Sequence, residues 1–117
     1  MFQGLRTIIY SVSDISAATA WYTRLVGKEP YFNEPFYVGF NVGGYELGLI
    51  PDGEGSTTYW GTANIETEYA RMLSIGANPH SQIKDVGDGI RVATVLDHEG
   101  NILGLIENPH FKIEHEN

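Results

Sequence analysis

Cysteine is absent from this sequence of 117 residues, and basic residues are scarce. Without a thiol, the chain can form no disulfide framework, no iron–sulfur cluster and no cysteine nucleophile. Seven Lys and Arg stand against 15 Asp and Glu, which gives a formal net charge of -8. Because sequence-independent nucleic-acid binding rests on basic side chains that neutralise phosphates, this charge argues against a nucleic-acid partner. The same charge favours solubility and a cationic ligand.

Long apolar runs are also missing. The apolar stretches are only a few residues long, whereas a membrane-spanning helix needs roughly 20 apolar residues. Residues 1–10 lack the basic and then apolar pattern of a secretory signal. We therefore expect a cytoplasmic protein with no membrane partner. Phosphate-binding glycine loops and the nucleophile elbow of hydrolases are absent as well.

The chain reads as two similar halves. In the first half, β-forming residues at 5–12 precede a helix that Asp14 caps and Gly27 ends. Gly43-Gly44 then predicts a hairpin turn between strands at 36–42 and 45–50. A further short strand is expected at 31–32, followed by a turn at 33–35. The helix stripe is expected to bury the apolar residues Ile15, Ala18, Tyr22, Leu25 and Val26.

The second half repeats this order after a turn-rich stretch. Asn64 caps a second helix that closes at Gly76, and strands are expected at 57–63, 81–86, 90–96 and 102–106. Residues 44–50 match residues 100–106 at five of seven positions. We therefore predict an α+β fold with two βαβββ modules. Module one covers residues 1–51, a linker covers 52–56, and module two covers 57–109. Residues 110–117 form a polar tail that is expected to pack loosely.

The opening of the first module resembles the vicinal oxygen chelate superfamily, which includes glyoxalase I, bleomycin-resistance proteins and extradiol dioxygenases. The resemblance rests on residues 8–14, the aromatic pair Trp21-Tyr22 with Ala20 before it, and the helix exit at 25–27. The turn at 97–101 is similar to the family's Asp-Pro-x-Gly-Asn turn, with His98 in place of proline. The resemblance implies that each module forms a half-barrel and that the paired modules enclose a cavity.

Enzymes of that superfamily hold a divalent metal with His, Gln and Glu side chains from the first and last strands of each module. The corresponding positions here are Thr7, Gly48, Thr57 and Gly104. None of them is a usual metal ligand, so the sequence predicts no metal and no cofactor. The four histidines, His80, His98, His110 and His115, show no metal-ligand spacing and are expected to be solvated.

Glu46 is the one carboxylate that shares a strand face with Gly48. Three interpretations stay open for it: a solvated glutamate at the rim, a cavity carboxylate that pairs with a cationic ligand, or part of a relocated metal site. As a catalytic candidate it would act as a general base.

Small residues on the last strands and many aromatic residues suggest a cavity for a flat or apolar ligand. Gly48 and Gly104 are expected to leave room in it, and the alternative is that neighbouring side chains fill the space. The predicted ligand-binding residues are Thr7, Ile9, Ser11, Glu46, Gly48, Tyr59, Trp60, Thr94 and Gly104.

The resemblance therefore implies a homodimer that binds an organic small molecule, similar to the metal-free bleomycin-resistance proteins. The ligand is expected to be cationic and antibiotic-like. The first alternative is a lyase or isomerase of the same superfamily with a displaced or absent metal site. The second is an interaction protein whose cavity has collapsed.

Overall fold

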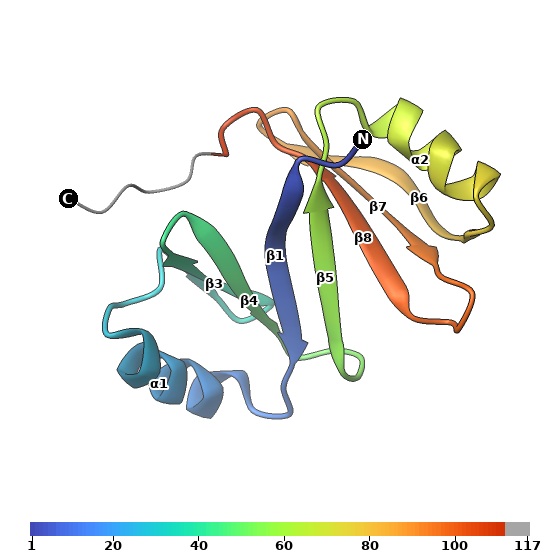
Figure 1. Cartoon of the computed structure of the whole chain (residues 1–117). Helices are drawn as coiled ribbons and strands as arrows, with labels where there is room; N and C mark the ends of the chain where they lie inside the picture. Colours follow the sequence, from blue (N-terminus) through green and yellow to red (C-terminus); the bar gives the residue numbers. More distant parts are fainter. Residues whose placement is uncertain (112–117) are drawn as a thin grey trace. The chain divides into compact units, whose positions relative to one another are not determined.

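A computed structural model describes residues 1–111 and shows the predicted α+β fold (Figure 1). Its residues form two compact units, of which one holds residues 7–56 and the other holds residues 1–6 together with 57–111. The expected tail therefore falls largely outside the described residues, and so does His115. No helix of residues 1–111 is long and apolar enough to cross a membrane.

Module one has the predicted βαβββ order. Its elements are β1 (Gly4–Ser11), α1 (Ile15–Val26), β2 (Phe32–Glu34), β3 (Tyr37–Val42) and β4 (Tyr45–Ile50). The strands are adjacent in the order β2-β3-β4-β1, with β1 parallel to β4 and the other neighbours antiparallel.

Module two repeats that order. Its elements are β5 (Ser56–Gly61), α2 (Ile65–Ser74), β6 (Asn78–Gly87), β7 (Ile90–Leu96) and β8 (Ile102–Glu107). The strands are adjacent in the order β5-β8-β7-β6, with β5 parallel to β8. The prediction of two βαβββ modules is therefore confirmed.

The helix boundaries follow from the capping residues that the sequence indicated. The Asp14 side chain accepts a hydrogen bond from the Ala17 N–H, and Asn64 accepts one from Thr67 in α2. Each bond satisfies a backbone donor that the first helical turn leaves without a partner. Gly27 ends α1 in the left-handed conformation, with φ of 85°.

The hairpins follow the turn chemistry of the sequence with one exception. Gly43 and Gly44 have φ of 63° and 93°, as a tight turn between β3 and β4 requires. The turn expected at 33–35 was placed too early, because Asn33 and Glu34 pair with β3 and the chain reverses at 35–36.

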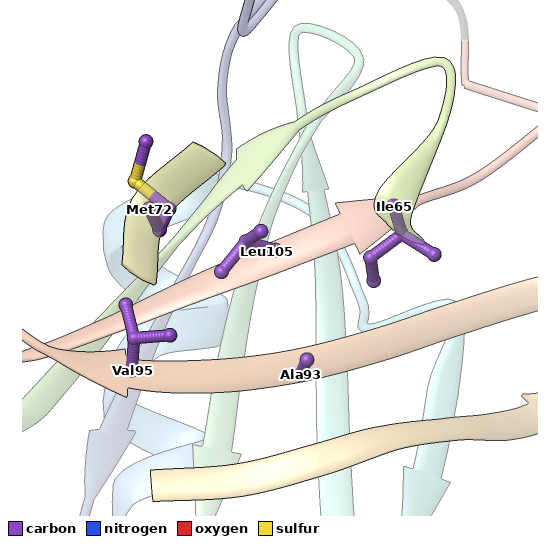
Figure 2. Packing of buried hydrophobic residues seen from close by; sticks show 5 residues of the cluster. All are labelled: Ile65, Met72, Ala93, Val95 and Leu105. Atoms are coloured by element: carbon purple, nitrogen blue, oxygen red, sulfur yellow. The ribbon is translucent and has the colours of Figure 1, made fainter. Parts of the chain in front are cut away.

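Each module buries one apolar cluster between its helix and one face of its strands. In module one, Ile15, Ala18, Tyr22 and Val26 of α1 pack against a buried cluster of Val38, Phe40, Leu47 and Leu49. In module two the buried cluster is Ile65, Met72, Ala93, Val95 and Leu105 (Figure 2). Each large apolar side chain removed from water stabilises the fold by about 1.5–3 kcal/mol.

The predicted stripe of α1 was wrong at Leu25, which is 60% exposed. Trp21 is 50% exposed, whereas its neighbour Tyr22 packs on the core. Adjacent helical residues point about 100° apart, so the core can take only part of the apolar set.

Candidate functional site

The face of the module one strands opposite α1 carries the first set of predicted site residues. Strand register places Thr7 opposite Glu46, and Ile9 opposite Gly48. On the other side of β4, Glu46 lies opposite Asn41, and Gly48 lies opposite Gly39. Since residues two apart on a strand share a face, Thr7, Ile9, Glu46 and Gly48 come together there.

Glu46 is held on this face by two phenols. The Tyr31 hydroxyl donates a hydrogen bond to Oε1 of Glu46, and the Tyr37 hydroxyl donates one to Oε2. Tyr31 precedes β2 and Tyr37 begins β3, so the hairpin between them brings both rings to one carboxylate. This partly buried, doubly bonded side chain is not a solvated rim glutamate, and within residues 1–111 it belongs to no cluster of three side chains that could hold a metal.

The two phenol rings lie over glycines. A Cβ added to Gly48 would stand 2.4 Å from the Tyr37 hydroxyl oxygen, and one added to Gly39 would stand 3.0 Å from the Tyr31 ring. The expectation that Gly48 leaves an open space is therefore wrong, because Tyr37 occupies that space. Glycine is needed there so that the ring can reach Glu46.

The Tyr31 hydroxyl is strongly biased toward its neutral form. Partial burial raises the pKa of Tyr31, and the hydrogen bond to Glu46 and its negative charge raise the pKa further. The phenol therefore stays a hydrogen-bond donor to Glu46 over the whole physiological pH range.

An aromatic group extends from the phenols. Phe32 lies 6.0 Å from the Tyr37 ring and 6.1 Å from the Phe36 ring, measured between centroids. Phe36 is 65% exposed and Tyr31 is 61% exposed. Module one thus presents accessible rings beside a carboxylate.

Ser11 lies at the end of the same strand, away from Glu46. Its N–H donates a hydrogen bond to the Gly55 carbonyl at 3.0 Å, and Ser11 pairs with Ile50. The contact ties the linker to the end of β1.

The second set of predicted site residues lies on module two. Gly104 is opposite Tyr59 on β5 and opposite Thr94 on β7. The Tyr59 ring covers Gly104, where an added Cβ would stand 2.4 Å from Cδ1 of the ring. As with Gly48, the expected open space is filled by a tyrosine. Burial raises the pKa of Tyr59, so its hydroxyl stays protonated.

Trp60 follows Tyr59 and lies on the other face of β5. It is opposite Leu105, which belongs to the buried cluster, and its ring is 5.5 Å from that of Phe2. The alternation of strand side chains thus separates Trp60 from Tyr59 and Thr94.

The sequence did not single out the residues that contact Thr94. The Thr94 hydroxyl lies 2.6 Å from the Ser81 hydroxyl and 2.8 Å from Nδ1 of His80. His80 was expected to be solvated, and although it is exposed, its ring is bonded to a buried threonine. A register shift in β6 produces this contact, and the sequence carries no signal for it.

The donor set at the family's metal positions does not fit a divalent metal. Thr7 and Thr57 offer only hydroxyls, and Gly48 and Gly104 have no side chain and lie under tyrosine rings. No cluster of three His, Cys, Asp or Glu side chains suited to a metal occurs within residues 1–111.

A shallow groove of about 750 Å³ lies on the helix side of module one. Its walls include Ser16, Thr19 and Thr23 of α1, with Glu29 and Glu34 across from them. Two of these hydroxyls are already bonded, because Thr19 donates to the Ile15 carbonyl and Thr23 to the Thr19 carbonyl. The groove contains none of the predicted site residues.

Comparison with solved structures identifies similar folds at low sequence identity. A glyoxalase/bleomycin resistance protein/dioxygenase superfamily member from Vibrio splendidus shares 18% identity over 89% of this chain and 99% of its own, with a TM-score of 0.68. A variant methylmalonyl-CoA epimerase from Streptomyces coelicolor, in complex with 2-nitronate-propionyl-CoA, shares 18% identity over 99% of this chain and 100% of its own, with a TM-score of 0.73.

The Mn(II)-bound glyoxalase from Novosphingobium aromaticivorans gives a TM-score of 0.78 at 14% identity, over 99% of this chain and 42% of its own. No protein-family model matches the sequence, and no curated protein matches it. The chain therefore has the vicinal oxygen chelate fold of the glyoxalase/bleomycin resistance/dioxygenase superfamily.

Proposed function

We propose that this protein binds and sequesters an organic cation at the helix-free face of module one. One observation carries the proposal: the Glu46 carboxylate is held by the Tyr31 and Tyr37 hydroxyls beside exposed aromatic rings. The ligand would place its charged group against Glu46 and its apolar part against the rings.

The charge of Glu46 supports a cationic ligand. None of the ion pairs between described residues involves Glu46. Each carboxylate oxygen accepts one phenol hydrogen bond and keeps a further lone pair for a ligand donor. The net charge of -8 would also attract a cation from solution.

The rings support an organic cation rather than a metal ion. A methylated or aryl ammonium gains about 0.5–2 kcal/mol from each aromatic face that it meets. Tyr31, Phe32 and Phe36 expose such ring surface on one hairpin. An ammonium with apolar substituents therefore suits this site better than an inorganic cation.

A lyase or isomerase with Glu46 as general base fits the geometry less well. Each Glu46 oxygen keeps one lone pair beside its phenol hydrogen bond, so a substrate proton could still reach it. The groups around it, however, are exposed aromatic rings, which offer contacts to a bound ligand. The arrangement favours recognition over proton transfer.

Isothermal calorimetry with an isosteric pair tests the proposal. We expect choline to bind the wild-type protein, and the uncharged 3,3-dimethyl-1-butanol to bind at least tenfold more weakly. Glu46→Gln keeps the shape and removes the charge, so it should weaken choline binding by about tenfold or more. Glu54→Gln in the exposed linker is the matched control and should bind as the wild type does. Equal binding of both ligands, or of Glu46→Gln and wild type, would refute the proposal.

We also propose that two chains pair as a homodimer. Trp21 and Leu25 lie one helical turn apart on α1, and each exposes half or more of its surface. We infer that a second copy of the chain covers this apolar pair, as exposed apolar patches often mark protein contacts. Light scattering should give twice the chain mass, and Trp21→Lys with Leu25→Lys should give the mass of one chain. A monomeric wild type at high concentration would contradict this.

A further inference from the structure

The His80, Ser81 and Thr94 cluster on module two lies outside the proposed cation site and has no role in it. Strand register places Ser81, Thr94, Gly104 and Tyr59 in one row across β6, β7, β8 and β5. Residues directly opposite one another share a face. Ala93, Val95 and Leu105 face α2, so this row lies on the other side of the strands. Three hydroxyl-bearing side chains and one glycine make up the row.

A bulge in β6 adds the imidazole to this row. Pro79 pairs with Val95 and Ser81 pairs with Thr94, so the two steps from Pro79 to Ser81 match a single step on β7. His80 is the extra residue. In a regular strand His80 and Ser81 would point to opposite faces, whereas here both side chains contact the Thr94 hydroxyl. Bulges that redirect a side chain in this way are over-represented next to active sites.

The hydrogen bonds of the cluster have a defined direction when His80 is neutral. The Thr94 N–H donates to Oγ of Ser81 at 3.0 Å, so that oxygen is an acceptor for the backbone. With Nδ1 of His80 as acceptor, the Thr94 hydroxyl donates to His80 over 2.8 Å, and the Ser81 hydroxyl donates to Thr94 over 2.6 Å. The result is a continuous path for a proton from Ser81 to an imidazole.

The exposure of the three residues suits their places on this path. Thr94 is 8% exposed, so its hydroxyl is shielded from exchange with water. Ser81 is partly exposed, and His80 at the other end is exposed. A reagent can thus reach Ser81, and the proton can leave from His80 to water.

We propose that His80 and Thr94 activate Ser81 as a nucleophile toward activated esters. Oγ of Ser81 attacks the acyl carbon and forms an ester bond, while the bond from that carbon to the aryl oxygen breaks. The Ser81 proton passes to Thr94, and the Thr94 proton passes to Nδ1 of His80 and then to water. The aryl oxygen leaves as the phenolate, so atoms and charge balance. An imidazole base usually activates a serine hydroxyl by a direct hydrogen bond, whereas here the Thr94 hydroxyl relays the proton between the two side chains.

Acetylation by p-nitrophenyl acetate tests this inference in the intact protein. Peptide mass spectrometry should find an acetyl group on Ser81, formed together with one equivalent of p-nitrophenolate. Ser74 is the internal control, because its hydroxyl donates to the Arg71 carbonyl and no hydrogen bond between described residues joins it to a histidine. We expect Ser81 to react about 100-fold faster than Ser74.

Variants of His80 and Thr94 show whether Ser81 reacts because of the proton relay or only because it is exposed. His80→Gln and Thr94→Val should each slow acetylation of Ser81 by at least tenfold, and Thr94→Ser should restore most of the rate because it keeps the hydroxyl. Because His80 is exposed, His80→Gln should still fold. It therefore tests the inference even if Thr94→Val is unstable. Acetylation of Ser81 at the rate of Ser74 would overturn the inference. An unchanged rate in folded His80→Gln, or adducts on Lys84 and tyrosines alone, would overturn it as well.

Discussion

The two modules share one backbone plan and differ in what covers their equivalent glycines. Gly48 lies under Tyr37, which comes from the neighbouring β3, whereas Gly104 lies under Tyr59 from β5. The tip of the Tyr37 ring contacts Gly48, and the base of the Tyr59 ring contacts Gly104. The repeated glycine therefore supplies space for a ring, and the strand that supplies the ring differs.

This difference determines which chemistry each module presents. In module one the phenol hydroxyls converge on a carboxylate, the group that we propose binds a charged ligand. In module two the ring covers Gly104, which pairs with Thr94, and β6 adds a hydroxyl and an imidazole that contact Thr94. A repeat at the level of the fold thus carries two different sets of polar groups, and fold and function can vary separately in this way.

Truncating the equivalent core leucines should have the largest effect on stability, and that effect should be similar in the two modules. Leu49 and Leu105 follow the two glycines, and both are fully buried. Leu49→Ala and Leu105→Ala should each lower the free energy of unfolding by about 3–4 kcal/mol, from lost burial and the cavity left behind. Urea denaturation followed by tryptophan fluorescence measures both. A twofold difference between them would show that the two clusters are not equivalent.

Replacing Gly48 and Gly104 with alanine should reveal the difference between the two covering rings. In Gly104→Ala the new Cβ meets the base of the Tyr59 ring, which cannot swing away, so we expect a loss of about 2–3 kcal/mol. In Gly48→Ala it meets the tip of Tyr37, which can rotate, so we expect about 1 kcal/mol. Thermal denaturation should place the two variants in this order.

A double-mutant cycle supplies the control for the glycine pair. Once Tyr59→Ser has removed the ring, adding Gly104→Ala should lower stability by less than about 0.5 kcal/mol more. If Gly104→Ala is equally damaging in the Tyr59→Ser background, the ring is not what demands glycine.

Acid should weaken the packing of module two through Glu68. This carboxylate is 2% exposed, and it bonds Arg71 and the α-amino group of Met1. Burial works to raise the pKa of Glu68, but these hydrogen bonds and charges prevail and hold it below the ordinary value of 4.5. The stabilisation is therefore complete above pH 4.5 and is lost as pH falls through the lower, folded-state value.

Stability measured between pH 7 and pH 3 tests this acid dependence. The unfolding midpoint should fall with pH in the wild type and fall less in Glu68→Gln, which cannot ionise. Module one shows the opposite dependence, since the raised pKa of Tyr31 gives stability that is lost only as pH rises above about 10. An identical acid fall in Glu68→Gln would contradict the role of this carboxylate.

Removing the helix caps should have the smallest effect on stability, and the effect should differ slightly between α1 and α2. Asp14→Ala removes the side-chain cap of α1 and should destabilise by about 1 kcal/mol. Asn64→Ala should destabilise by only about 0.5 kcal/mol. At the start of α2, the Ile65 N–H still donates a hydrogen bond to Oε1 of Glu107, over 3.0 Å. Thermal denaturation of the two alanine variants compares them, with Glu107→Ala, which removes the acceptor, added to Asn64→Ala as the control. The same loss for both caps would show that Glu107 offers no support.

The elements that the sequence predicted are those encoded by neighbouring residues. Asp14, Asn64 and the glycines at 43–44 act on their own turns, so their roles follow from local chemistry. The shared face of Glu46 and Gly48 also followed from strand periodicity.

The contents of each site could not be predicted in this way. The rings over Gly48 and Gly104 come from other strands, and their reach depends on register that the sequence does not state. The same is true of His80, whose contact with Thr94 depends on a single extra residue in β6. Long-range pairing and bulges therefore mark the limit of sequence-based prediction here.

A titration of the ¹⁵N-labelled protein with benzyltrimethylammonium tests most directly the claim that module one recognises a cation. We expect dose-dependent shifts of the amide signals of Thr7, Tyr31, Tyr37 and Glu46, with those of Thr94 and Gly104 unmoved. The shifts should be lost in Glu46→Gln and kept in Glu54→Gln. Shifts confined to module two, or none at saturating ligand, would contradict the claim.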